Sequence, residues 1–270
     1  MSVLIQPFKM RTLHKFERED IVRPFLRWAG GKQRLLPALL DRLPPREKIG
    51  AYFEPFAGAA SLFLAVGFKD AWLGDLNAPL INTYRHIRDS PEAVFGQAKK
   101  LTNLLAIFKS SFYYETREKY NEDLLAETIL QAARFIFLNH SNFNGIYRVN
   151  KSKGHYNVPY GHKHIINTPS LERLLAISKR LENVELRVGY YDEMLDNVVP
   201  GDFVYLDPPY PVLSKTAHFT AYTIDKFSEK HHRELGAIAN ELKDRGANVM
   251  ISSTDVPLIR ELFQGWEFFG

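Results

Sequence analysis

Hydrophobic positions along this chain follow two periods. Short apolar runs rich in β-branched and aromatic residues are typical of buried strands, and they occupy 52–56, 71–74, 184–188, 203–206 and 247–251. Apolar residues at helical spacing predict helices over 32–43, 62–66, 80–88, 91–108, 124–138, 171–181, 230–245 and 256–263. Strands that alternate with helices in this way predict an α/β fold.

One strand is followed at once by chemistry-bearing residues. The run 203–206 is ended by Pro208 and Pro209, which remove backbone donors and fix φ. Asp207 therefore lies at the carboxyl end of a strand, where ligands bind in open α/β sheets. Asp207 and the Pro208 carbonyl can accept hydrogen bonds from an amino group, and Tyr210 offers a flat face for stacking. The alternative is a strand-ending turn with a capping Asp, but the complete string favours binding of a planar heterocycle with an exocyclic amine.

The string Asp207-Pro208-Pro209-Tyr210 resembles the DPPY motif of the amino-methyltransferases, which methylate exocyclic nitrogens with S-adenosylmethionine. Segments over residues 24–251 resemble, in the same order, motifs of the Dam-type (D12 class) DNA adenine-N6 methyltransferases, which include GATC-specific methylases. The resemblance implies a Rossmann-like sheet with an inserted helical and β-hairpin DNA-recognition subdomain. It also implies that these four residues are catalytic and that S-adenosylmethionine is the cofactor.

Residues 52–66 are typical of a strand, a small-residue loop and a helix, which together begin a nucleotide-binding βα unit. Small residues around Gly58 let a cofactor approach the backbone. Asp75 follows Gly58 by 17 positions, close to the spacing of about 20 for an acid that binds ribose hydroxyls. The alternative is that Asp75 caps the helix beginning near Asn77; we assign the ribose role to Asp75 and the cap to Asn77. Ala60 stands where many family members have glycine.

A second candidate segment, Phe-Leu-Arg-Trp-Ala-Gly-Gly-Lys, covers residues 25–32. Its paired glycines allow close backbone approach before a helix start, and Lys32 adds positive charge. Taken alone the motif is weak, and it lacks the P-loop spacing. In the similar family segment the Trp and the Lys lie against the methyl donor, and the adenine pocket lies near the end of the 184–188 strand. The resemblance implies these cofactor contacts: Trp28, Gly30, Lys32, Glu54, Pro55, Phe56, Gly58, Asp75, Asn77, Tyr191, Asp192 and Asp207.

Composition changes after Leu138. Residues 139–163 contain four Lys or Arg, three His and no acid. Alternation at 146–149 and 156–158, with a turn between them, predicts a protruding hairpin. Basic side chains suit phosphates, Asn and Arg suit base edges, and Phe143 or Ile146 could wedge into a base step; the alternative is a solvated basic loop. The family reads DNA with a similar segment, which implies these contacts: Asn142, Phe143, Asn144, Ile146, Arg148, Asn157 and Pro159.

These segments divide the chain. We expect an N-terminal arm over 1–24, a cofactor-binding and catalytic domain over 25–78 and 165–270, and a DNA-recognition subdomain over 79–164 that carries the hairpin 139–163. The segment 211–227 resembles a family loop and is expected to close over the target base. Family members usually continue through an antiparallel hairpin with a basic loop, which this chain lacks, and Ser252-Ser253 stands where Ser-Asn is usual.

Composition limits the other possibilities. The 270 residues are 45% hydrophobic and 24% charged, with a net charge of +4, which permits a polyanionic partner. Cysteine is absent, which excludes disulfides and thiolate chemistry. No apolar stretch resembles a secretory signal or a membrane span. We therefore expect a cytoplasmic protein with no membrane partner and no metal, acting as a monomer; the resemblance allows a companion restriction endonuclease.

The expected activity is site-specific methylation of adenine N6 in duplex DNA by base flipping. Hydrogen bonds from the amine to Asp207 and to the Pro208 carbonyl would favour a more nucleophilic nitrogen. GATC as the target follows from the resemblance alone. Two alternatives stay open: an amino-methyltransferase acting on RNA or protein, and a catalytically impaired DNA-binding homologue, which the missing C-terminal hairpin suggests.

Overall fold

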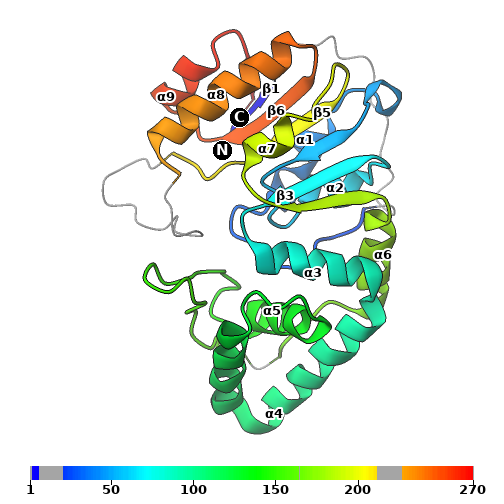
Figure 1. Cartoon of the computed structure of the whole chain (residues 1–270), viewed down its shortest axis with the longest axis vertical. Helices are drawn as coiled ribbons and strands as arrows, with labels where there is room; N and C mark the ends of the chain where they lie inside the picture. The colour runs from blue at the N-terminus through cyan, green and yellow to red at the C-terminus, as the bar shows by residue number, and fades with distance from the viewer. Residues whose placement is uncertain (1, 6–20, 164, 212–226, 270) are drawn as a thin grey trace.

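A seven-stranded sheet forms the centre of the protein. The computed structural model describes residues 2–5, 21–163, 165–211 and 227–269 (Figure 1). Its strands are β1 (Ser2–Ile5), β2 (Tyr52–Glu54), β3 (Ala71–Asp75), β4 (Val184–Val188), β5 (Phe203–Leu206), β6 (Asn248–Ser253) and β7 (Glu267–Phe269). They lie in the order β4-β3-β2-β5-β6-β1-β7. The five strands from β4 to β6 are parallel, so the predicted α/β class is confirmed. The predicted loop 211–227 lies outside the described residues except at its two ends.

Residues 2–5, part of the segment expected to be an arm, belong to the sheet as β1. Leu4 pairs antiparallel with Ile251 of β6 on one side and with Phe268 of β7 on the other. Its side chain is fully buried. Among the described residues β7 pairs only with β1, so the N-terminal strand joins β7 to the rest of the sheet. The antiparallel strand of this sheet thus comes from the N-terminal side of the chain.

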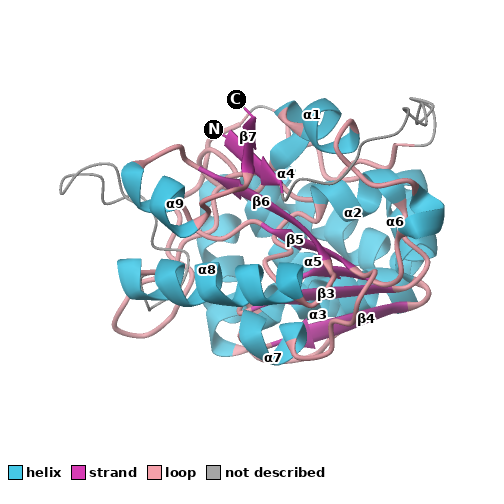
Figure 2. Cartoon of the chain, turned by 90° about the horizontal axis from the view of Figure 1, so that it is seen from above, coloured by secondary structure: helices cyan, strands magenta, loops and turns pink. Residues whose placement is uncertain are grey.

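Alternate side chains of the strands build two cores, one on each face of the sheet. In β5, Phe203 and Tyr205 belong to one core, and Val204 and Leu206 belong to the other; all four are fully buried. The helices α7 (Tyr191–Leu195), α8 (Glu229–Asp244) and α9 (Pro257–Leu262) contribute to the second core. The first core receives α1 (Leu36–Leu40), α2 (Ser61–Val66) and α3 (Ala78–Asp89). Figure 2 shows α8 crossing one face of the sheet with α2 on the opposite face.

A helical unit extends from the α3 side of the sheet (Figure 1). It consists of α4 (Pro91–Glu122), α5 (Ile129–Ser141) and α6 (Leu171–Leu181). Lys109 has φ of 53° and kinks α4, so the predicted helix 91–108 is the first arm alone and the second arm was not predicted. Short 3-10 turns at Lys32–Arg34 and Arg46–Lys48 complete the helical elements. None of the described helices is long and apolar enough to cross a membrane.

The predicted hairpin is irregular. Its two legs meet only at isolated bridges, Val149 with Tyr156 and Asn142 with Tyr160, so the regular strands predicted at 146–149 and 156–158 are wrong. Pro159 has no N–H for a ladder. The legs are held to the helical unit instead, because the buried Tyr113 hydroxyl of α4 donates a 2.8 Å hydrogen bond to the carbonyl of Val158.

Candidate active site

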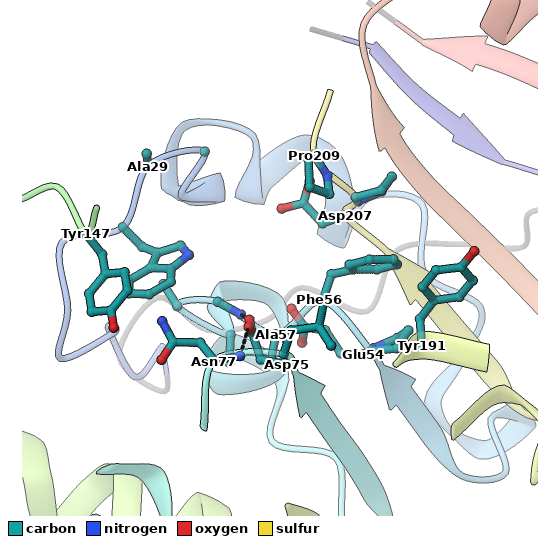
Figure 3. A pocket seen from close by; sticks show the side chains of 18 of the residues that line it. Ala29, Glu54, Phe56, Ala57, Asp75, Asn77, Tyr147, Tyr191, Asp207 and Pro209 are labelled. Carbon is teal, nitrogen blue, oxygen red and sulfur yellow. Dashed lines mark hydrogen bonds between the residues drawn. The ribbon is translucent and has the colours of Figure 1, made fainter. Parts of the chain in front are cut away.

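A cavity of about 590 Å³ opens where the parallel strands β2 to β5 end. Parallel sheets bind their ligands at this edge. The cavity lining contains these predicted catalytic and cofactor-binding residues: Trp28, Gly30, Lys32, Glu54, Pro55, Phe56, Gly58, Asp75, Asn77, Tyr191, Asp207, Pro208, Pro209 and Tyr210. In Figure 3, Asp207 and Pro209 lie on one side of the cavity and face Asp75 and Asn77 on the other. The structure thus brings together segments far apart in the sequence.

Asp207 is held by a buried lysine. Lys32 Nζ lies 2.5 Å from Oδ2 of Asp207, donates a hydrogen bond to the Gly30 carbonyl and stands 5.1 Å from the centroid of the Tyr210 ring. The side chains of Lys32 and Asp207 are 4% and 20% exposed. Burial raises the pKa of Asp207 to about 6, and the ammonium of Lys32 opposes that rise. Lys32 is therefore the counter-ion of Asp207, a role that the sequence did not indicate.

Two acceptors at this end of the cavity remain available. The other carboxylate oxygen of Asp207, Oδ1, is 3.5 Å from the Tyr210 hydroxyl, at the limit of a hydrogen bond. Within the described part of the chain, no donor contacts the Pro208 carbonyl oxygen. A ligand with an amino group can therefore donate to both atoms.

Glu54 is a second buried acid, at the end of β2. Its side chain is 2% exposed, and its Oε2 accepts a 2.8 Å hydrogen bond from the Tyr52 hydroxyl. Burial raises the pKa of Glu54 to about 8, although this hydrogen bond lowers it. Glu54 is therefore mostly protonated at neutral pH, and a cationic ligand group beside it would favour its ionised form.

Asp75, at the end of β3, is tied to the loop after β2. Its Oδ2 accepts from the Gly58 N–H at 3.0 Å and its Oδ1 from the Asn77 N–H at 2.9 Å. Burial raises the pKa of Asp75, and these N–H groups oppose the rise. Each carboxylate oxygen has a second lone pair, so Asp75 can still accept from a ligand. Asn77 caps α3 by accepting from the Leu80 N–H, which confirms that part of the prediction.

The loop after β2 needs unusual backbone conformations. Gly58 has φ of +46°, and a Cβ there would lie 2.8 Å from ring atoms of Trp28, so both conformation and space require glycine. Ala60 has φ of +48°, a left-handed conformation that costs a non-glycine residue roughly 1–2 kcal/mol. A glycine at this position would adopt the same conformation without that cost.

Aromatic rings bound the cavity at both ends. Trp28 stacks on Tyr147 with the ring centroids 5.5 Å apart. At the opposite end (Figure 3), the centroids of Phe56 and Tyr191 are 5.2 Å apart, and Phe227 packs edge-on against Phe56. Neither Tyr147 nor Phe227 was predicted from the sequence as a cavity residue. For Tyr147, the only signal was its position directly before Arg148, because its stacking partner Trp28 lies far away in the sequence.

Asp192 differs from the other predicted cofactor contacts. It is exposed on the first turn of α7, is absent from the cavity lining, and accepts a hydrogen bond from the Glu193 N–H at 3.0 Å. An acidic side chain in the first turn of a helix is stabilised by the helix dipole, so the position of Asp192 is explained without a ligand.

The predicted DNA contacts fall into three groups. Phe143, Asn144, Arg148 and Pro159 are exposed, and Ile146 and Asn157 are half-buried. Asn142 is 0% exposed, and its Nδ2 donates to the Ile146 carbonyl and the Tyr156 hydroxyl. Asn142 therefore stabilises the loop, because a fully buried side chain cannot contact DNA.

A further basic residue lies beside this loop. The Asn139 side chain accepts from the Arg27 N–H and donates to the Arg27 carbonyl. Arg27 itself is exposed, and a Cβ at Gly145 would lie 2.6 Å from its Cδ. Arg27 therefore lies against the turn that precedes Arg148 and adds positive charge there.

Fold and cavity define an α/β protein that binds its ligands at the carboxyl edge of a mainly parallel sheet. A family model for the D12 class N6 adenine-specific DNA methyltransferases matches residues 28–269. The chain belongs to this family of site-specific, adenine-specific DNA methyltransferases, which act on DNA and generally use S-adenosylmethionine.

Proteins of similar sequence carry names that agree with this family. The chain is 36% identical over 248 residues to "Type II methyltransferase M1.LlaDCHI" of Lactococcus lactis subsp. cremoris, covering 90% of this chain and 85% of that protein. It is 33% identical over 258 residues to "Type II methyltransferase M.MjaIII" of Methanocaldococcus jannaschii, covering 91% and 89%. It is 34% identical over 246 residues to the "DNA adenine methylase" of Escherichia coli (strain K12), covering 90% and 84%.

Proposed function

We propose that this protein transfers a methyl group from S-adenosylmethionine to N6 of an adenine in duplex DNA, within GATC, after flipping the base out of the helix. One observation carries the proposal. The amine-accepting string at the end of β5 and the acids at the ends of β2 and β3 line one cavity, so a methyl donor and a base would meet there.

The cavity suits the cofactor, which supplies an activated methyl group on a sulfonium. Asp75 is positioned to accept from ribose hydroxyls, since both of its oxygens keep a lone pair. Phe56 and Tyr191 offer ring faces for the adenine moiety. Glu54 places a buried acid where a cationic ligand group would be stabilised. Gly58 and its small neighbours allow close approach to the backbone.

Asp207 and Pro208 would activate the target amine. The N6 lone pair of adenine is delocalised into the ring, and hydrogen bonds to Asp207 Oδ1 and to the Pro208 carbonyl favour a more tetrahedral, nucleophilic nitrogen. Positive charge develops on that nitrogen during transfer, and the ionised carboxylate stabilises it. Positioning of the two reactants supplies much of the remaining rate.

The side chain of Asp207 is only 20% exposed, so an adenine that stays stacked in a duplex could not bring its amine to it. The base must therefore leave the helix. Tyr210 would then stack on the flipped base and replace part of the lost stacking energy.

The exposed residues of the hairpin provide the proposed DNA surface. Phe143 is 53% exposed and could wedge between bases, while Asn144, Arg148 and Pro159 face solvent beside it. Arg148 would read a guanine through its two major-groove acceptors. We also propose that residues 79–164 act as the DNA-recognition subdomain, that the protein acts as a cytoplasmic monomer, and that a restriction endonuclease accompanies it. The type II names of two relatives support the last point.

The test combines the purified protein, labelled S-adenosylmethionine and duplexes that differ only in carrying GATC. We expect N6-methyladenine, identified by mass spectrometry, in the GATC duplex alone. RNA and protein substrates tested in parallel address the remaining alternatives. Cofactor binding without transfer to any substrate would contradict the proposal.

A further inference from the structure

Arg148 and Asn157 are joined twice across the hairpin. The Asn157 N–H donates to the Arg148 carbonyl at 3.1 Å, and Arg148 Nε donates to Asn157 Oδ1 at 2.8 Å. The first bond sets the distance between the two legs. The second bond ties the arginine side chain itself to the opposite leg.

The backbone at Asn157 is anchored to α4 through both of its neighbours in the chain. On one side, the Asn121 amide of α4 accepts from the Tyr156 N–H at 2.8 Å and donates to the Tyr156 carbonyl at 3.0 Å. On the other side, the Tyr113 hydroxyl of α4 donates to the Val158 carbonyl. Both neighbours of Asn157 are therefore fixed to the same helix, and its backbone cannot shift without breaking these bonds.

The hydrogen bond at Nε leaves the two terminal nitrogens of the Arg148 guanidinium available for another partner. An arginine has five N–H donors in a planar fork, and this bond occupies one. No residue in the described ranges forms a hydrogen bond or an ion pair with the terminal nitrogens of Arg148. Because the group is planar, fixing Nε also orients the plane of the two terminal nitrogens. A fork contact with guanine O6 and N7 needs such nitrogens.

We infer that Asn157 is a positioning residue, which orients the Arg148 guanidinium for guanine and does not itself contact a base. The inference rests on the proposed reading of guanine by Arg148. An arginine ordered before DNA binds loses less side-chain freedom on binding. Asn157 would then increase sequence discrimination without changing affinity for unrelated DNA.

The experiment measures kcat/KM on the preferred duplex and on the same duplex with the guanine replaced by 7-deazaguanine, which lacks N7. Asn157→Ala should reduce the preference for guanine by about 2- to 12-fold, the effect of leaving one long side chain unordered. Asn157→Asp keeps an acceptor oxygen for Nε and should retain the preference, although its negative charge weakens binding to all DNA.

Asn150→Ala is the matched control. Asn150 Oδ1 accepts from the Lys153 N–H at 2.9 Å within the hairpin turn, so this variant loosens the hairpin without touching Arg148. We expect it to retain the preference. A separate measurement without DNA follows the Nε–H resonance of Arg148, which should shift in Asn157→Ala and stay in place in Asn150→Ala.

Two results would overturn the inference: equal losses on both duplexes in Asn157→Ala, or the same loss of preference in Asn150→Ala. Failure of the underlying proposal has a different signature. Arg148→Ala would then keep the full preference for guanine over 7-deazaguanine, whatever the Asn157 variants do.

Discussion

Replacing Lys32 with methionine tests the electrostatics of the site most directly. This substitution removes the ammonium 2.5 Å from Asp207 Oδ2 while keeping an apolar chain of similar length. Asp207 is poorly solvated, and burial already raises its pKa to about 6. Loss of the nearby opposite charge should raise the pKa of Asp207 further, on the order of 1–3 units.

The magnitude at neutral pH follows from the ionised fraction. With the Asp207 pKa at about 6, about 90% of the carboxylate is ionised at pH 7. With a pKa of about 7–9 in Lys32→Met, between about 50% and 1% would be ionised. Since the ionised form accepts the amine, the transfer rate at pH 7 should fall by roughly 2- to 90-fold. Because the ionised carboxylate is the active form, activity is lost as the pH falls through the pKa of Asp207.

The assay is the single-turnover transfer rate at saturating cofactor and DNA from pH 5 to 9.5. In the parent protein we expect the rate to fall at acid pH with a midpoint near pH 6. In Lys32→Met we expect this acid limb of the pH–rate profile to lie about 1–3 pH units higher, with the rate recovering at high pH. Lys32→Arg keeps the charge and should keep the limb near its original position. Lys230→Met removes an ammonium whose side chain is 82% exposed and should change nothing. An unshifted limb in Lys32→Met would refute the reasoning.

Three further variants test other parts of the structure. Asp207→Ala should abolish single-turnover transfer while the far-UV circular dichroism spectrum is retained; a rate within a few-fold of the parent would remove Asp207 from the mechanism. Asp75→Ala should weaken cofactor binding in calorimetry by about 1–3 kcal/mol, whereas Asp192→Ala, outside the cavity lining, should not. Leu4→Ala should lower the free energy of unfolding in urea by about 2–5 kcal/mol, and Ile107→Ala, 67% exposed, should change it by less than about 0.5 kcal/mol.

Local signals in the sequence were sufficient where one segment carries the whole pattern. The helix 171–181 and the strand 203–206 have the predicted bounds, because an uninterrupted period or an apolar run before two prolines needs no partner to be recognised. The loop after β2 was predicted as a cofactor site from a strand followed by small residues and a helix, a weak local signal, together with the resemblance to the family's first cofactor motif; Pro55, Phe56 and Gly58 line the cavity.

Features that depend on distant partners could not be predicted in this way. The strand Ser2–Ile5 is specified by partners at 250–253 and 267–269, and four residues alone carry no reliable period. The kink at Lys109 has no proline or glycine to announce it. Asn142 looked like a base contact because it is polar in a basic loop, yet its partner Tyr156 lies 14 positions away. Burial of a polar residue follows from such partners rather than from its own type.

The segment 25–32 connects parts of the site that the chain otherwise separates. Trp28 stacks on Tyr147 at the base of the hairpin, and Lys32, four positions later, pairs with Asp207. Between them lies Gly30-Gly31, with φ of +77° at Gly30. Glycine adopts this left-handed conformation at little steric cost, so a short turn carries the chain from the Trp28 ring to the Asp207 carboxylate. Lys32 occupies Oδ2 of Asp207 and stands 5.1 Å from the centroid of the Tyr210 ring. Oδ1 of Asp207 stays available to a target amine, so a base can bind at this end of the cavity while Lys32 keeps Oδ2 paired.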